Sequence, residues 1–172
     1  YVTSQYVHKS MDRGHSWEKV SPDLTRHDAT TMGASGGPIS KDNTGVETYA
    51  TIFAFAESTL EKGIFYAASD DGLIHISKDN TKTWENITPK SSLLPEFALM
   101  SIVEVSPHDP ATVYVAATRF KLNDFKPYLL KSTDYGKSWK LITSGIPADQ
   151  FTRVIREDPT RKDLLYAGTE QG

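Results

Sequence analysis

The stretch Ser132-Thr133-Asp134-Tyr135-Gly136-Lys137-Ser138-Trp139 decides the fold of this chain, because it recurs twice with small changes. Related stretches occupy residues 10–17 (SMDRGHSW) and 77–84 (SKDNTKTW). Each of the three, called a box below, lies between short apolar runs, and together the boxes contain all three tryptophans. A motif that returns after 67 and then 55 residues indicates a repeat protein.

The apolar runs around each box predict four strands per repeat, because they are short and bounded by turn residues. In the middle repeat we expect strands at 48–55, 63–69, 73–76 and 83–87. In the next repeat we expect them at 99–105, 112–117, 128–131 and 138–142. Repeated four-stranded antiparallel units predict an all-β fold of the β-propeller type.

The repeats divide the sequence into blades and half blades. We expect half blades at residues 1–20 and 150–172, and blades at 47–88 and 98–143. A closed propeller has about four to eight blades, so we expect the remaining blades to lie outside this segment.

The repeated residues of each box predict a turn. A short acceptor follows the first serine and a tryptophan closes the box, as in the pairs Asp12 and Trp17, Asp79 and Trp84, and Asp134 and Trp139. The carboxylate can accept hydrogen bonds from N–H groups of the turn, and the indole ring can be buried against neighbouring strands. Gly14 and Gly136 suit a positive φ, whereas Thr81 stands in their place in the middle box. There we expect Asn80 to take the left-handed conformation, or the turn to differ.

The recurrence of the box carboxylates favours this structural role over catalysis or calcium binding. A residue present in every blade serves what every blade needs, whereas catalytic groups must converge at one place. We therefore look for function in the parts of the sequence that do not repeat.

Composition excludes several classes of function. The chain has 172 residues, a formal charge of −3 and no cysteine, so a basic nucleic-acid surface, disulfides and thiolate metal sites are not expected. No run approaches the roughly 20 apolar residues of a membrane span. The sequence opens at Tyr1 in a predicted strand, so we expect no signal peptide within this segment. No cofactor motif is present. The histidines are scattered and predict no metal site; these residues are His8, His15, His27, His75 and His108.

Three stretches between the repeats carry the candidate site residues. The segment 21–47 is far longer than the median connection of about 4–6 residues, which is typical of a functional or a covering loop. The stretch 69–72 offers Asp70 and Asp71 as candidate catalytic carboxylates, although Asp-Gly also predicts a hairpin turn.

The third stretch, 119–128, mixes charges with aromatic rings that could stack on a sugar or pack in a surface hairpin. Asp124 is its candidate catalytic carboxylate. The candidate ligand-binding residues here and on the following strand are Arg119, Lys121, Tyr128 and Arg153.

The pattern Ser-x-Asp-x-Gly-x-Ser/Thr-Trp resembles the BNR or Asp-box repeat of sialidases, sortilin-type receptors and two-propeller glycoside hydrolases that cleave xyloglucan. Residues 17–26, 37–45, 54–58 and 151–159 resemble large secreted bacterial proteins labelled glycosyl hydrolase-like or sortilin-like BNR-repeat proteins. The resemblance implies a propeller of about seven blades on a secreted, periplasmic or cell-surface protein. It also implies that the boxes lie on the face away from any active site. The hydrolase label rests largely on the repeat.

A sialidase site does not fit the residues of this segment. Such a site gathers three arginines on a carboxylate, and the segment offers Arg119, Arg153 and Arg156. Arg153 and Arg156 are three apart on one predicted strand, so strict alternation places them on opposite faces.

The resemblance and the residues together predict a binding or scaffolding propeller that engages a polysaccharide or a protein. The alternative is a glycoside hydrolase of the two-propeller type, which uses a pair of carboxylates partly supplied by blades outside this segment. The sequence leaves enzymatic activity open, because the fold does not decide between these functions.

Overall fold

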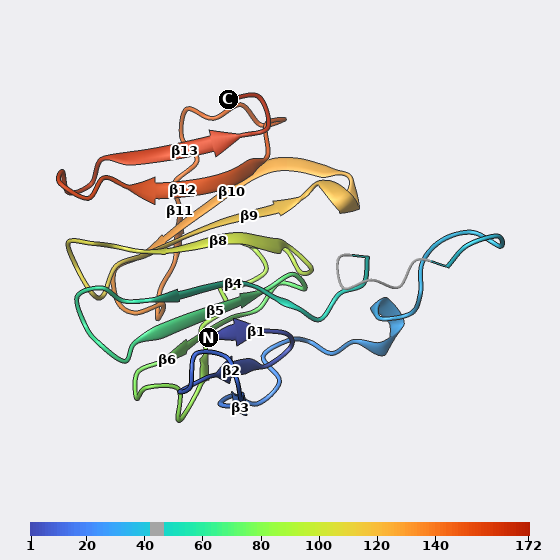
Figure 1. The fold of residues 1–172 in the computed structure, drawn as a ribbon. Coiled ribbons are helices and arrows are strands. Elements are labelled where there is room, and N and C mark those ends of the chain that lie inside the picture. The colour runs from blue at the N-terminus through green and yellow to red at the C-terminus, as the bar shows by residue number, and fades with distance from the viewer. Residues whose placement is uncertain (42–46) are drawn as a thin grey trace.

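The computed structural model describes residues 1–41 and 47–172, and strands dominate it. The strands form four antiparallel sheets that lie one above another, from β1–β3 to β12–β13 (Figure 1). Within these described residues, helix is limited to two 3-10 turns, η1 (Ala29–Thr31) and η2 (Phe120–Leu122). The structure therefore has the predicted all-β architecture of four-stranded antiparallel sheets.

Two of the sheets are complete and follow the chain order from first to fourth strand. The second sheet contains β4 (Ile52–Glu57), β5 (Phe65–Ser69), β6 (Ile74–Ser77) and β7 (Glu85–Asn86). The third sheet contains β8 (Leu99–Val105), β9 (Val113–Arg119), β10 (Asp124–Ser132) and β11 (Lys140–Leu141). The fourth strands, β7 and β11, are the outer strands of these sheets, and each is only two residues long, which limits the exposed sheet edge.

The first and last sheets contain three and two strands. The first is formed by β1 (Val2–Thr3), β2 (Val7–Lys9) and β3 (Glu18–Lys19), with the first box between β2 and β3. The last is formed by β12 (Thr152–Glu157) and β13 (Leu165–Thr169). The box position shows that β1–β3 match the second to fourth strands of a complete sheet.

The core lies between the sheets. Its largest cluster joins the two complete sheets and includes the fully buried Tyr66, Ile74, Met100 and Leu130. Smaller clusters join the first sheet to the second and the third to the last. Stacking therefore buries the apolar faces, at roughly 25 cal/mol for each Å² removed from water.

The first strands of the last three sheets, called inner strands below, are β4, β8 and β12, and each contains one extra residue near its start. The register shifts at Phe53 in β4, at Ser101 in β8 and at Arg153 in β12. A bulge redirects a side chain and breaks the alternation of faces, so the prediction that Arg153 and Arg156 lie on opposite faces loses its basis. The two arginines pair instead with carboxylates of different sheets, at 2.9 Å from Glu170 and 2.7 Å from Glu104.

The box turns have two consecutive residues with positive φ. The values are 60° and 94° at Arg13 and Gly14, 61° and 70° at Asn80 and Thr81, and 60° and 84° at Tyr135 and Gly136. Thr81 thus keeps the conformation of the glycines that it replaces, and Asn80 does not take it over alone. The reason is that the Thr81 N–H still donates to Ser77 Oγ at 2.9 Å, as Gly136 N–H does to Ser132 Oγ at 2.8 Å.

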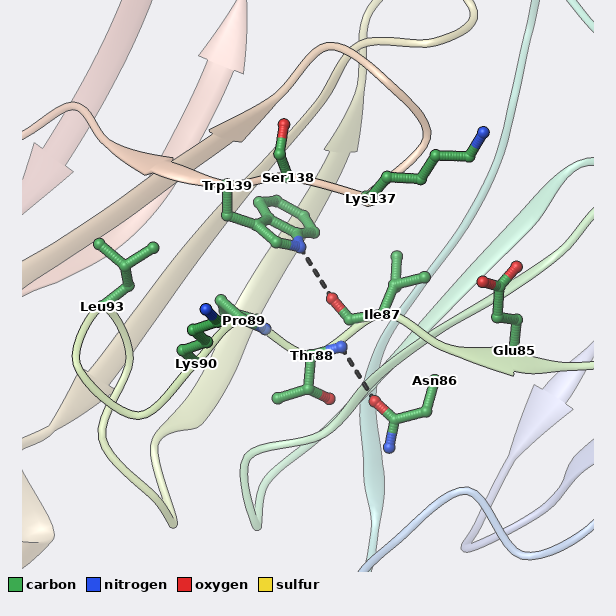
Figure 2. Close-up of a pocket in the computed structure, with 11 residues that line it drawn as sticks. Glu85, Asn86, Ile87, Thr88, Pro89, Lys90, Leu93, Lys137, Ser138 and Trp139 are labelled. Carbon is green, nitrogen blue, oxygen red and sulfur yellow. Dashed lines mark hydrogen bonds between the residues drawn. The ribbon is translucent and has the colours of Figure 1, made fainter.

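The box tryptophans connect consecutive sheets. Trp139 Nε1 donates to the carbonyl of Ile87 at 2.8 Å (Figure 2). Trp84 Nε1 donates to the carbonyl of Val20 at 3.2 Å, one sheet earlier. Val20 directly follows β3 and Ile87 directly follows β7, so the same contact helps to fix the second sheet on the first and the third sheet on the second.

Candidate functional site

The two ends of the stacked sheets carry different kinds of turn. At one end the boxes contact the turns between first and second strands, through bonds such as Asn80 N–H to Gly63 O at 3.0 Å and Tyr135 N–H to Ala111 O at 2.9 Å. The other end, called the loop end below, carries the turns at 70–73 and 120–123 and the connections between sheets. The connection that contains η1 extends beyond the sheets at this end (Figure 1).

The box carboxylates are used within their own turns. Asp134 Oδ1 accepts from Ser138 N at 2.9 Å and from Ser132 Oγ at 2.8 Å, while Oδ2 accepts from Ser138 Oγ at 2.5 Å. Asp12 and Asp79 accept the same set of bonds from their own boxes. The hydroxyl of the Ser or Thr before each tryptophan, followed by its N–H, lowers the pKa of each aspartate to about 2.

A groove of about 650 Å³ lies beside the third box (Figure 2). It is lined by residues 85–90 and 136–139 together with Leu93. A similar groove of about 510 Å³ lies one sheet earlier, lined by the corresponding residues 18–22 and 80–82 and by Lys9. Because the groove occurs at two successive pairs of sheets, it belongs to the stacking of the repeat and not to a unique site.

A smaller cavity of about 220 Å³ opens at the loop end. Glu47, Asp70 and Lys121 line it, one from each of the three stretches that the sequence singled out. The remaining lining residues, which we did not predict, are Thr48, Tyr49, Leu99 and Leu122. The structure thus brings the three unrepeated stretches together at one place, called the Asp70 cavity below.

Asp70 is the buried carboxylate of this cavity, with 6% of its surface exposed. Its Oδ1 accepts from Ala50 N at 3.1 Å and from Thr51 N at 2.9 Å, and no other described residue donates to Oδ2. Burial raises the pKa of Asp70 to about 6, against the backbone N–H groups of Thr51, Ala50 and Asp70 itself, which lower it, and the negative charge of Asp71 raises it further. The carboxylate therefore has one oxygen left for a ligand.

Asp71 has a different environment from its neighbour. Its Oδ1 accepts from Ser69 Oγ at 2.5 Å, and its Oδ2 accepts from Arg26 N at 2.8 Å. Arg26 Nε also donates to the Asp71 carbonyl at 2.8 Å. Both carboxylate oxygens are thus occupied, and Asp71 anchors the long connection to the turn at 70–73.

The stretch 119–128 is a hairpin rather than one continuous loop. Arg119 ends β9 and Asp124 begins β10, with η2 between them. Asp124 Oδ2 accepts from Arg119 Nη1 and from the Tyr128 hydroxyl, both at 2.8 Å. Burial acts to raise the pKa of Asp124, but the bonds from Tyr128 and Arg119 lower it overall. Burial, followed by the bond to Asp124, raises the pKa of Tyr128 to about 12. Three predicted site residues therefore satisfy one another within the hairpin.

Arg153 is likewise engaged inside the chain. Its guanidinium lies 4.8 Å from the ring centre of Phe120 and 4.7 Å from that of Phe151, and it pairs with Glu170. Of the residues predicted for catalysis or ligand binding, Asp70 and Lys121 are the two that line the Asp70 cavity.

The walls of the cavity are held by contacts that the sequence did not reveal. The ring of Tyr49 lies tilted against that of Phe97, with 5.5 Å between ring centres, and the guanidinium of Arg26 lies 5.2 Å from the Phe97 ring centre. Glu96 accepts from Arg26 through its carboxylate at 3.5 Å and from Arg119 Nε through its carbonyl at 3.1 Å. Tyr49 and Leu99 lie just before or at the start of an inner strand, a place with no distinctive residue pattern.

Among the described residues, no three His, Asp or Glu side chains are grouped to hold a metal ion. No helix in this part of the chain is long and apolar enough to cross a membrane.

The sequence matches no family model and no curated protein. The structure is similar to that of an ancestral GH74 enzyme, with a TM-score of 0.66 and 15% identity over 99% of this chain and 20% of that one. It also matches YCF48 from Cyanidioschyzon merolae (TM-score 0.49, 19% identity, 62% of this chain and 31% of that one). A further match is the GH74 xyloglucanase from Xanthomonas campestris (TM-score 0.46, 17% identity, 59% and 16%).

The match to the ancestral GH74 enzyme supports the fold. Together with the stacked antiparallel sheets, the match to the ancestral GH74 enzyme shows that the chain is a segment of a β-propeller. The chain spans at most a third of the length of each of these proteins. At such low identity the similarity concerns the fold alone.

Proposed function

We propose that this chain is part of an exported BNR-repeat β-propeller that binds a carbohydrate or protein ligand at its loop end. The observation that carries the proposal is the Asp70 cavity, where a buried carboxylate has an oxygen to spare. In each box carboxylate, in contrast, both oxygens accept hydrogen bonds from the carboxylate's own turn. A polar group that is already desolvated and fixed contributes most to the affinity for a ligand, because the group need not be ordered on binding.

The test is a binding screen against a panel of polysaccharides and a peptide library, using the wild-type chain and Asp70→Asn. We expect a ligand whose affinity falls at least tenfold in Asp70→Asn. The matched control is Glu170→Gln, since that carboxylate is paired with Arg153 and should leave affinity unchanged. Equal binding by wild type and Asp70→Asn would place the site elsewhere, and a panel without any ligand would reject the proposal.

A glycoside hydrolase is the alternative, and one observation favours it. Glu47 lines the same cavity as Asp70, so two carboxylates share it. A carboxyl group whose pKa is raised to about 6 suits a general acid, and glycosidases require a second carboxylate as base or nucleophile. Blades outside this segment are part of this alternative, because they can contribute further carboxylates.

Release of reducing ends from a polysaccharide panel that includes xyloglucan separates the two functions. Under the alternative, Asp70→Asn and Glu47→Gln each lower turnover by a factor of about 100 or more, as expected for loss of an acid or base. Under the binding proposal, the wild-type chain releases no reducing ends from a polysaccharide that it binds.

A further inference from the structure

A comparison of the second sheet with the last sheet shows what the Asp70 carboxylate lacks. Asp70 and Glu170 occupy equivalent positions, because Ser69 pairs with Ile52 as Thr169 pairs with Thr152. The backbone contacts agree: Asp70 N–H donates to Thr51 O at 2.9 Å, and Glu170 N–H donates to Phe151 O at 3.2 Å. Each carboxylate also lies beside an inner strand with a bulge at the same register position.

The residue at that bulge differs between the two sheets. In the last sheet it is Arg153, whose Nε lies 2.9 Å from Glu170 Oε2. In the second sheet it is Phe53, which brings no charge. The charge that acts on Asp70 is that of Asp71, which is negative. The last sheet thus has a carboxylate with a cation at the bulge, and the second sheet has the carboxylate of Asp70 without one; the third sheet has no carboxylate at the equivalent position.

The cavity around Asp70 is shaped for an aliphatic stem. Leu99, Leu122 and the ring of Tyr49 provide apolar walls, and its volume of about 220 Å³ is below the roughly 300–1,000 Å³ of sites for drug-sized ligands. Glu47 and Lys121 also line it and offset each other in charge, so Asp70 leaves the cavity with a net negative charge. A narrow apolar cavity with one buried carboxylate fits a lysine side chain, which buries its methylenes and pairs its ammonium.

We propose that the Asp70 cavity binds a lysine side chain of a protein ligand, with the ammonium on the carboxylate of Asp70 and the methylene stem against Leu99 and Leu122. This inference rests on the proposed binding function and narrows it to a protein. An amino sugar would carry the same cation, but its ring hydroxyls would need several partners beside apolar walls.

The direct test is NMR titration of the chain at pH 7, read at the amide signals of Ala50 and Thr51, which donate to Asp70. The probes are n-butylammonium, the neutral n-butanol and glucosamine. We expect saturable shifts with n-butylammonium and at least tenfold weaker binding of the other two. Equal binding of n-butanol would remove the role of the charge, and tighter binding of glucosamine would favour a sugar; either result overturns the inference.

Two variants test the assignment to Asp70. Asp70→Asn should weaken n-butylammonium binding at least tenfold, whereas Glu170→Gln should leave it unchanged. Phe53→Arg should reproduce the Arg153–Glu170 pair and also weaken binding at least tenfold. Phe53 is 54% exposed, so this change leaves the core intact, which unchanged amide signals of the third sheet would verify. Unaltered n-butylammonium binding in Asp70→Asn contradicts the inference.

The two proposals can fail separately. If the screen finds no ligand but n-butylammonium saturates the Asp70 signals, the binding function is rejected and the chemistry of the cavity stands. If a protein ligand is found whose affinity is the same in Asp70→Asn and Phe53→Arg, the lysine site is rejected and the binding function stands.

Discussion

At the scale of single residues, the box aspartates and Asp70 perform opposite tasks. The box aspartates are exposed or half-buried and are surrounded by donors, so their pKa values fall to about 2. Asp70 is buried with two backbone donors and a negative neighbour, so its pKa rises to about 6. The first environment stabilises a turn, whereas the second destabilises the ionised fold and leaves a carboxylate ready for a partner.

Asp70→Asn should therefore stabilise the chain at neutral pH. The folded pKa of about 6 lies above the unfolded value of 3.8, so the wild-type folded state binds more protons between these values and loses stability as pH rises through them. Asparagine keeps an acceptor for Ala50 and Thr51 without the charge. We expect a gain of about 1–2 kcal/mol at pH 7 and little gain at pH 3.5, measured by urea unfolding. A loss of stability at pH 7 would contradict the assigned environment.

His75 should contribute the opposite dependence on pH. It is 8% exposed, its Nδ1 has no hydrogen-bond partner among the described residues, and burial lowers its pKa to about 4 although Asp23 acts to raise it. The unfolded state then binds the extra proton between pH 6.5 and 4, so this contribution to stability is lost as pH falls through that window. His75→Phe should flatten the decrease, which unfolding at pH 4.5 and pH 7 measures. An unchanged slope would show that His75 does not titrate there.

At the scale of elements, the second and third box turns each fit against the residue that follows the last strand of the previous sheet. A Cβ added to Gly136 would lie 2.3 Å from Ile87 Cδ1 and 3.0 Å from its Cβ, so the glycine makes room for isoleucine. In the preceding interface Thr81 takes the place of the glycine and Val20 that of the isoleucine. The larger turn residue thus faces the smaller partner.

Gly136→Ala should destabilise the chain by about 2–4 kcal/mol, through strain at a φ of 84° and the clash with Ile87. Ile87→Val removes the Cδ1 that lies nearest. In the double variant we expect part of the loss to return, because the clash disappears while the backbone strain persists. A double-mutant cycle of urea unfolding measures this coupling, and strictly additive effects would contradict the proposed fit.

At the scale of the whole molecule, the repeat made the fold predictable. Three boxes placed the turns, and the apolar runs around them placed the strands, because each sheet needs the same turn, the same buried ring and the same alternation. The strand ends were less accurate: β7 and β11 are two residues long where five were expected, since only two residues of each pair with the neighbouring strand.

The candidate site was only partly predictable. The three unrepeated stretches were recognised, and they meet in one cavity through Glu47, Asp70 and Lys121. The sequence did not distinguish Asp70 from Asp71, because their roles depend on Arg26, which binds Asp71 and precedes it by 45 residues in the sequence. It also did not reveal the bulges or the walls formed by Tyr49 and Leu99, which depend on how the sheets stack. Local patterns predict repeated contacts, whereas a site built once by tertiary packing leaves no periodic signal.

The central claim is that the boxes maintain the fold and that the Asp70 cavity binds the ligand. It is tested most directly by measuring affinity for the ligand found in the screen and the melting temperature of the same samples, for Asp70→Asn and Asp134→Asn at pH 7. We expect Asp70→Asn to lose binding without melting lower, and Asp134→Asn to melt lower while binding like the wild type below its transition. Loss of binding in folded Asp134→Asn, or intact binding in Asp70→Asn, would contradict the claim.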